Sequence, residues 1–138
     1  MIVDPQELQA ITQSWRVVRT LCESSHRQVQ VPGGPFYNET RPEDSYNLPF
    51  VLAYAVLDEV LDALLRQGVF SCSKRRPTLK DLMDAARPHL PWRDFALVDT
   101  GKGARNKLAH KAVLLSKTEC LRFVDAIERE LVAWGIVR

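Results

Sequence analysis

Apolar residues recur at steps of three and four through much of the chain, which is the spacing of one buried face on an α-helix. The first such segment opens with Asp4-Pro5-x-Glu7. This sequence predicts a helix start, because Asp4 can act as the N-cap and Pro5 occupies the first helical position. Glu7 can reach back to the backbone amide of the N-cap residue. The apolar face of this helix is Leu8, Ile11, Trp15, Val18 and Cys22.

Residues 48–67 are apolar nearly all round, which is typical of the central helix of a bundle. Three polar residues, Asp58, Asp62 and Arg66, follow one another at steps of four and form one stripe. The two aspartates could serve as a carboxylate pair for acid–base chemistry or a metal. Their spacing from the arginine favours an i,i+4 ion pair instead.

Two capping boxes predict further helix starts, Thr78-x-x-Asp81 and Ser116-x-x-Glu119. The helix after Ser116 continues with apolar residues at helical spacing until Gly135 stops it. Between these two helices, residues 92–112 also have a helical pattern.

Gly101 and Gly103 weaken the middle of the 92–112 helix, so that a break there is possible. The pair could also let a phosphate backbone approach closely, but a lone G-x-G more often marks a kink or tight helix packing.

Residues 23–47 lack the helical period and contain Pro32-Gly33-Gly34-Pro35 and Arg41-Pro42-Glu43-Asp44. We expect a long loop there, and loops of this length are usually functional or mobile. No segment shows the sustained alternation of a β-strand. The pattern therefore predicts an all-α bundle of four to five helices, in a single domain that covers residues 1–138.

Composition agrees with this fold class, since 46% of the 138 residues are hydrophobic and 26% are charged, as in a soluble globular protein. The three cysteines lie about fifty residues apart with no C-x-x-C pair. This spacing argues against a disulfide framework and against a zinc module. The N-terminal residues do not resemble a signal peptide, and no apolar run is long enough to span a bilayer. We expect a cytoplasmic protein without a membrane partner.

Charge is distributed unevenly along the chain. The total of 19 basic and 17 acidic residues gives a net charge of +2. Five of the basic residues, and no acidic residue, lie between positions 100 and 118, which leaves 14 basic against 17 acidic residues elsewhere. Those five are Lys102, Arg105, Lys107, Lys111 and Lys117.

Within this basic segment, Asn106 and His110 are four residues apart and share one helical face, while the long side chain of Arg105 can swing toward it. An imidazole can transfer protons near neutral pH, a guanidinium can stabilise a charged phosphorane, and an amide can orient either group. These are the requirements of phosphodiester cleavage. The chemistry needs no metal and no cofactor.

The sequence Arg105-Asn106-x-x-x-His110 resembles the R-x(4–6)-H motif of the HEPN superfamily (higher eukaryotes and prokaryotes nucleotide-binding domain), in which a polar residue often follows the arginine. The resemblance implies a HEPN-like helical bundle and a metal-independent endoribonuclease, commonly a toxin or a phage-defence enzyme. It also implies a homodimer whose two motifs form one composite site, with an antitoxin protein as a possible partner.

On this resemblance, His110 would activate the ribose 2′-hydroxyl or protonate the leaving oxygen, Arg105 would hold the scissile phosphate, and Asn106 would position either group. The expected products are a 2′,3′-cyclic phosphate and a 5′-hydroxyl end. Lys102, Lys107 and Lys111 would bind RNA phosphates. Position 112 is Ala, where one branch of the family has a modified tyrosine, so that form of regulation is not expected.

Other interpretations stay open. Arg19 and His26 also satisfy a loose R-x6-H pattern, although Arg19 is followed by Thr and ends the first helix. The run Lys74-Arg75-Arg76 could contact RNA but is more typical of an exposed loop. His110 could simply cap a helix end or pack at a dimer seam. The alternative function is a non-catalytic HEPN-like module that binds nucleotide, nucleic acid or a protein partner, with the 23–47 loop as its docking segment.

Overall fold

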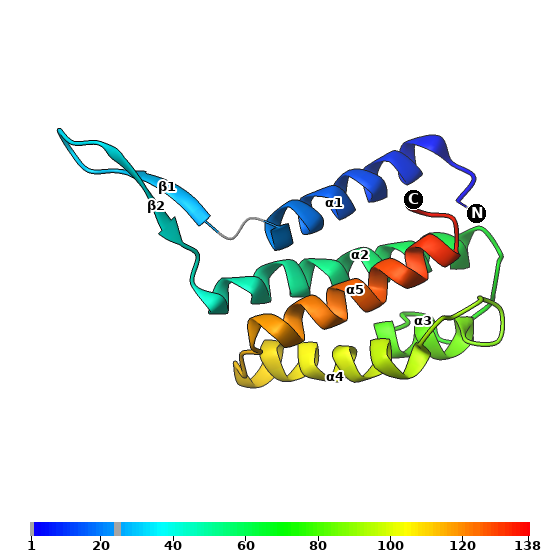
Figure 1. Cartoon of the computed structure of the whole chain (residues 1–138). Coiled ribbons are helices and arrows are strands. Elements are labelled where there is room, and N and C mark those ends of the chain that lie inside the picture. Colours follow the sequence, from blue (N-terminus) through cyan, green and yellow to red (C-terminus); the bar gives the residue numbers. More distant parts are fainter. Residues whose placement is uncertain (1, 24–25) are drawn as a thin grey trace.

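The described residues form a bundle of five α-helices with a β-hairpin between the first two (Figure 1). The computed structural model describes residues 2–23 and 26–138. The helices are α1 (Pro5–Glu23), α2 (Asn47–Arg66), α3 (Leu79–Ala86), α4 (Phe95–Lys111) and α5 (Lys117–Ala133). The predicted all-α bundle of four to five helices is confirmed.

Helix α2 is the centre of the bundle, because it contacts α1, α3, α4 and α5. In Figure 1, α1 lies on one side of α2, α3 and α4 lie on the other, and α5 runs alongside. Phe50 of α2 packs edge-on against Tyr54, with ring centroids 5.3 Å apart, and against Phe123 of α5 at 5.8 Å. The prediction that residues 48–67 form the most buried helix is therefore confirmed.

The predicted helix starts at residues 78 and 116 are present as hydrogen-bonded caps. The side chain of Thr78 accepts from the Asp81 amide, and the Asp81 carboxylate accepts from the Thr78 amide in return. Ser116 Oγ accepts from the Glu119 amide at 3.2 Å. These caps need only residues three positions apart, which is why the sequence alone identifies them.

The expected long loop over residues 23–47 is instead largely ordered as a hairpin. Strands β1 (His26–Gln30) and β2 (Phe36–Thr40) pair antiparallel, and the short helix η1 (Glu43–Tyr46) leads into α2. Ser24 and Ser25, which belong to the same expected loop, lie outside the described residues. The strands carry few apolar residues in alternation, so their pairing left no periodic signal in the sequence.

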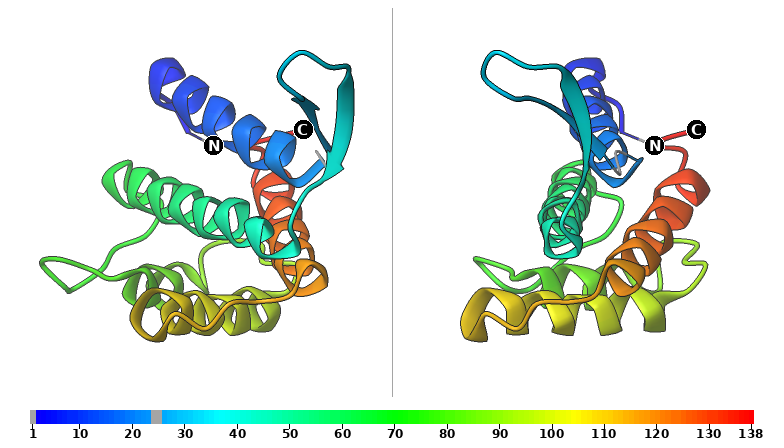
Figure 2. Two further views of the ribbon diagram at one scale, coloured as in Figure 1. Left: turned by 90° about the vertical axis from the view of Figure 1, so that its left-hand side faces the viewer. Right: turned by 60° about the vertical axis from the view of Figure 1, so that its left-hand side comes forward.

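The hairpin projects from one end of the bundle. Its base is fixed by Arg41, whose guanidinium donates to the Leu21 carbonyl and to Ser45 and lies 4.2 Å from the centre of the Tyr46 ring. Figures 1 and 2 both place the hairpin on the side of α1, away from α4. The hairpin therefore does not cover the surface of α4.

Both ends of α4 are held by buried polar side chains from other helices. At its start, the fully buried Glu130 of α5 accepts hydrogen bonds from the amides of Arg93 (2.7 Å) and Asp94 (3.0 Å). Burial raises the pKa of the Glu130 carboxyl. Beyond its end, Asn47 of α2 bonds both the carbonyl and the amide of Leu115, at 3.0 and 2.9 Å. These contacts fix α4, which carries the basic segment, against the bundle.

Candidate functional site

Helix α4 is continuous through Gly101 and Gly103, so the break that these glycines made possible is absent. It begins at Phe95 rather than Trp92, because Asp94 caps it by accepting from the Leu97 amide at 3.1 Å. Gly101 is buried, and a Cβ atom there would collide with the Tyr54 hydroxyl and lie 2.7 Å from Phe123. Gly101 thus allows α4 to pack tightly against α2 and α5.

Arg105 and Asn106 are joined by a hydrogen bond on the second half of α4. Arg105 Nη2 donates to Asn106 Oδ1 at 2.9 Å. The Arg105 side chain is half-buried and Asn106 is exposed, so the guanidinium reaches from the flank of the helix to its outer face. This is the swing expected from the sequence. One of the five N–H donors of the guanidinium is used in this contact.

His110 lies one helical turn beyond Asn106 and is exposed. In the part of the chain that the structure describes, its side chain makes no hydrogen bond or ion pair. The end of α4 is capped by backbone groups instead: the left-handed Ala112 donates to the Leu108 carbonyl at 3.1 Å. His110 is therefore not the capping residue of this helix, and its side chain is exposed.

The three lysines predicted to bind phosphate differ in their surroundings. Lys107 and Lys111 are exposed on α4. Lys102 is buried, and its Nζ lies 2.6 Å from Asp99 Oδ1 in an ion pair. The structure thus does not bring Lys102 to the exposed surface with the others, because its charge is already neutralised one turn earlier on the same helix. The i,i+3 spacing of Asp99 and Lys102 was the signal in the sequence that could have distinguished this lysine from the other two.

The positive charge of Arg105 acts on two side chains of α2. Burial raises the pKa of Tyr54 and of Asp58, and in both cases the Arg105 charge opposes the shift. Tyr54 also donates to the Val98 carbonyl of α4 at 2.7 Å. Tyr54 and Asp58 of α2 therefore lie within the electrostatic influence of Arg105, and the sequence did not indicate this proximity.

Two alternative interpretations of charged residues are settled by ion pairs. Asp62 binds Arg66 at 3.0 Å, as the i,i+4 spacing predicted, and Arg66 also binds Glu7 of α1. Asp58 is not part of that pair. Arg19, the rival arginine, binds Asp125 at 2.8 Å and Glu128 at 3.3 Å on α5. Arg19 thus ties α1 to α5, and the side chain of His26, its partner in the loose pattern, lies outside what the structure describes.

The other basic residues and histidines lie away from the motif on α4. Lys74, Arg75 and Arg76 are exposed in the loop before α3. His89 lines a cavity of about 470 Å³ together with Cys72, away from α4's motif. Among the described residues, no group of three or more His, Cys, Asp or Glu side chains is placed to hold a metal ion.

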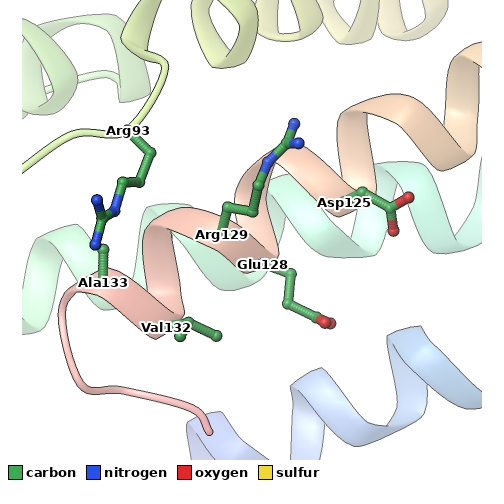
Figure 3. A pocket seen from close by; sticks show the side chains of 6 residues that line it. All are labelled: Arg93, Asp125, Glu128, Arg129, Val132 and Ala133. Carbon is green, nitrogen blue, oxygen red and sulfur yellow. The ribbon is translucent and has the colours of Figure 1, made fainter.

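Two cavities lie beside helices α4 and α5. One, of about 430 Å³, runs beside α4 and is lined by Gly103 and Lys107 of that helix and by Glu119 of α5. The other, of about 390 Å³, lies on α5 (Figure 3). Its lining residues are Arg93, Asp125, Glu128, Arg129, Val132 and Ala133.

The carboxylates of the α5 cavity are already engaged by α1. Asp125 binds Arg19, and Glu128 accepts from the Trp15 indole at 2.9 Å. In Figure 3, Glu128 points toward α1 and Arg129 points to the opposite side of α5. No histidine is among the residues that line this cavity, and its two carboxylates are engaged by α1, which makes the exposed face of α4 the better candidate site.

No protein-family model, curated protein or solved structure significantly matches this chain. Within the described residues, no helix combines the length and apolar character needed to cross a membrane. The resemblance to HEPN proteins thus rests on Arg105, Asn106, His110 and the order of the helices.

Sequence reasoning missed the residues that hold α4 in place. Glu130 and Asn47 look like ordinary surface residues of amphipathic helices, yet both are buried and hydrogen-bonded to backbone. A charged residue at an otherwise apolar helical position, as Glu130 is between Ile127 and Leu131, was the one available signal.

Proposed function

We propose that this protein is a HEPN-type, metal-independent endoribonuclease, whose catalytic residues are Arg105, Asn106 and His110. The observation that supports the proposal most strongly is the hydrogen bond from Arg105 to Asn106, with the uncommitted imidazole of His110 one turn further along the same exposed face. A guanidinium oriented by an amide beside a free imidazole suits cleavage of a phosphodiester.

In the proposed reaction, the RNA strand supplies its own nucleophile. One imidazole removes the proton from the ribose 2′-hydroxyl, whose oxygen attacks the adjacent phosphorus, and the bond to the 5′-oxygen breaks. That oxygen leaves with a proton from the second imidazole of a composite site. Arg105 stabilises the extra negative charge on the phosphorane, and Lys107 and Lys111 attract neighbouring phosphates.

Incubation of the protein with single-stranded RNA in excess EDTA tests this function. We expect fragments that end in 2′,3′-cyclic phosphate and begin with 5′-hydroxyl, because the mechanism uses only side chains. The ends can be identified by their resistance to phosphatase and by mass spectrometry. RNA left intact over a range of RNA sequences would favour the non-catalytic binding module instead.

The composite site requires a homodimer, and exposed apolar residues on α2 suit such an interface. Leu48 is 57% exposed and Val51 is 37% exposed, and the two lie three residues apart on one face of α2. Val113 and Leu114 expose further apolar surface after the end of α4. Apolar residues clustered in this way are typical of protein–protein contacts.

Light scattering at micromolar concentration should therefore report a dimer. Leu48→Glu should shift the protein to monomer, because it places a charge within the interface while glutamate is well tolerated in the first turn of a helix. Val132→Glu is the matched control, at an apolar position of α5 that is 46% exposed, and should stay dimeric. A monomeric wild type would contradict both the interface and the composite site.

A further inference from the structure

The cavity of about 430 Å³ beside α4 lies next to the part of the helix that carries His110. Helix α4 contributes Gly103 and Lys107 to its lining, and α5 contributes Glu119. Lys107 precedes His110 by three residues, so their Cβ atoms are about 5–6 Å apart on the helix surface. The cavity therefore adjoins the candidate site.

Most of the cavity wall is apolar. Val113 and Leu114, in the segment between α4 and α5, are exposed and line the cavity together with the buried Phe123. Gly103 adds open space, because a Cβ atom there would meet no atom within 4 Å. Cavities of roughly 300–1,000 Å³ with apolar walls and a few polar groups are typical of ligand sites. Such walls favour an uncharged ring over a hydrated ion.

Two charged side chains line the same cavity without pairing with each other. In the part of the chain that the structure describes, Lys107 makes no hydrogen bond or ion pair, so its ammonium is free to bind an anion. Glu119 accepts from the Ser116 hydroxyl through Oε1 at 3.1 Å, and its Oε2 has no partner among the described residues. An ionised carboxylate only accepts hydrogen bonds, so Glu119 selects a ligand that offers N–H groups.

An RNA nucleotide combines the groups that this lining selects. Its phosphate is an anion, its base is an uncharged ring, and the Watson–Crick edge of the base is accessible in a single strand. Guanine has two neighbouring N–H donors on that edge, which a carboxylate can accept as a pair. Adenine and cytosine have one amino donor beside a ring nitrogen that only accepts, and uracil has its N–H between two carbonyl oxygens. Glu119 therefore matches guanine best.

We propose that this cavity binds the base of an RNA nucleotide beside the cleaved bond and prefers guanine. Glu119 accepts the two N–H groups of the base, the apolar wall covers the ring, and Lys107 binds a phosphate of the same strand. This inference rests on the proposed ribonuclease function and adds a sequence preference to it. The cavity shares Val113 and Leu114 with the apolar surface described above, so it lies at the edge of the composite site.

Binding to oligonucleotides that cannot be cleaved tests the preference without any need for activity. The probes are short strands of 2′-deoxyuridine with one central deoxyguanosine, deoxyadenosine or deoxycytidine, and they lack the attacking 2′-hydroxyl. Fluorescence anisotropy gives their affinities. We expect the wild type to bind the deoxyguanosine probe about tenfold more tightly than the deoxyadenosine probe, as is usual for a base contact made through two hydrogen bonds.

Glu119→Gln should bring the ratio of these two affinities close to one, because a glutamine side chain offers one acceptor and one donor instead of two acceptors. Glutamine also serves at this position of a capping box, so the start of α5 is kept. The ratio is the readout, since the loss of a negative charge raises the affinity for every oligonucleotide. Asp81→Asn makes the same change in the capping box of α3 and should leave the ratio at its wild-type value.

Gly103→Leu tests the cavity itself. The new side chain starts in open space and extends into the cavity, so the variant should fold but lose the preference for deoxyguanosine. Gly103→Ala leaves most of the space open and should keep the preference. Circular dichroism and thermal unfolding check that both variants are folded.

The outcomes separate this inference from the proposed function. Equal affinities of the wild type for the three probes, or a preference that survives both Glu119→Gln and Gly103→Leu, overturns the base site even if the protein cleaves RNA. A preference that both variants abolish, in a protein that leaves RNA intact, supports the base site and overturns the ribonuclease function. If both proposals hold, RNA of mixed sequence should be cut next to guanosine, and Glu119→Gln should spread the cuts over other bases.

Discussion

Replacing His110 with alanine should lower the rate of RNA cleavage by roughly 10²–10⁴-fold, the usual contribution of a general acid or base. In the proposed mechanism both proton transfers use an imidazole, so the variant removes both from the dimer at once. The substitution should leave stability nearly unchanged, because the side chain is exposed and makes no hydrogen bond or ion pair within the described part of the chain. Initial rates in EDTA, measured on a fluorescently labelled RNA, give the comparison.

The matched control is His89→Ala. His89 is also exposed, but it lies after α3 beside a different cavity. This variant should cleave RNA as fast as the wild type, with the same cyclic phosphate ends. If His110→Ala retains the wild-type rate in a folded protein, His110 is not a catalytic residue and any cleavage observed comes from another site or from a contaminant.

The parts of the fold that depend on neighbours in sequence could be predicted closely. Asp4 accepts from the Gln6 amide at 2.9 Å at the start of α1, and the capping box at Thr78 is formed in both directions. At Ser116 the hydroxyl accepts from the Glu119 amide, which is one half of the predicted box. Each of these caps joins residues two or three positions apart, so its signal is local. The same holds for Gly135, whose positive φ of 70° ends α5.

The hairpin could not be predicted in the same way. His26 pairs with Thr40 and Gln30 with Phe36, so its hydrogen bonds join residues that are distant in the chain. The two strands together carry few apolar residues in alternation, so the sequence has no period-two signal there. The Pro-Gly-Gly-Pro run marked a turn, but not the strands on either side of it.

The candidate site was predicted in its residues but not in its contacts. The motif in the basic segment between positions 100 and 118 identified Arg105, Asn106 and His110. The same segment suggested Lys102 as a phosphate-binding residue, but its charge is neutralised by Asp99. The effect of the Arg105 charge on the pKa of Tyr54 and of Asp58 depends on where α2 crosses α4. That crossing is determined by Gly101 beneath the Tyr54 hydroxyl, a contact between residues 47 positions apart in sequence. The spacing of apolar residues along each helix does not predict this contact.

Gly101→Ala tests how far the site depends on this crossing. The new methyl group would overlap the Tyr54 hydroxyl and approach two Phe123 ring carbons to 2.7 and 2.9 Å, although both rings belong to the core. Overpacking of this kind typically costs about 1–3 kcal/mol, and loss of the hydrogen bond from Tyr54 to Val98 adds about 1–3 kcal/mol. Since alanine favours a helix by about 1 kcal/mol over glycine, we expect a net loss of about 1–5 kcal/mol in urea denaturation.

Gly103→Ala provides the matched control on the same helix. A Cβ atom at Gly103 would meet no atom within 4 Å, so only the helix propensity changes. This variant should be as stable as the wild type or more stable by up to about 1 kcal/mol. Equal stabilities for the two variants would show that α2 and α4 are not in close contact at Gly101. If Gly101→Ala alone is destabilised and also loses RNA cleavage under conditions where it remains folded, the orientation of Arg105 depends on the crossing of the two helices.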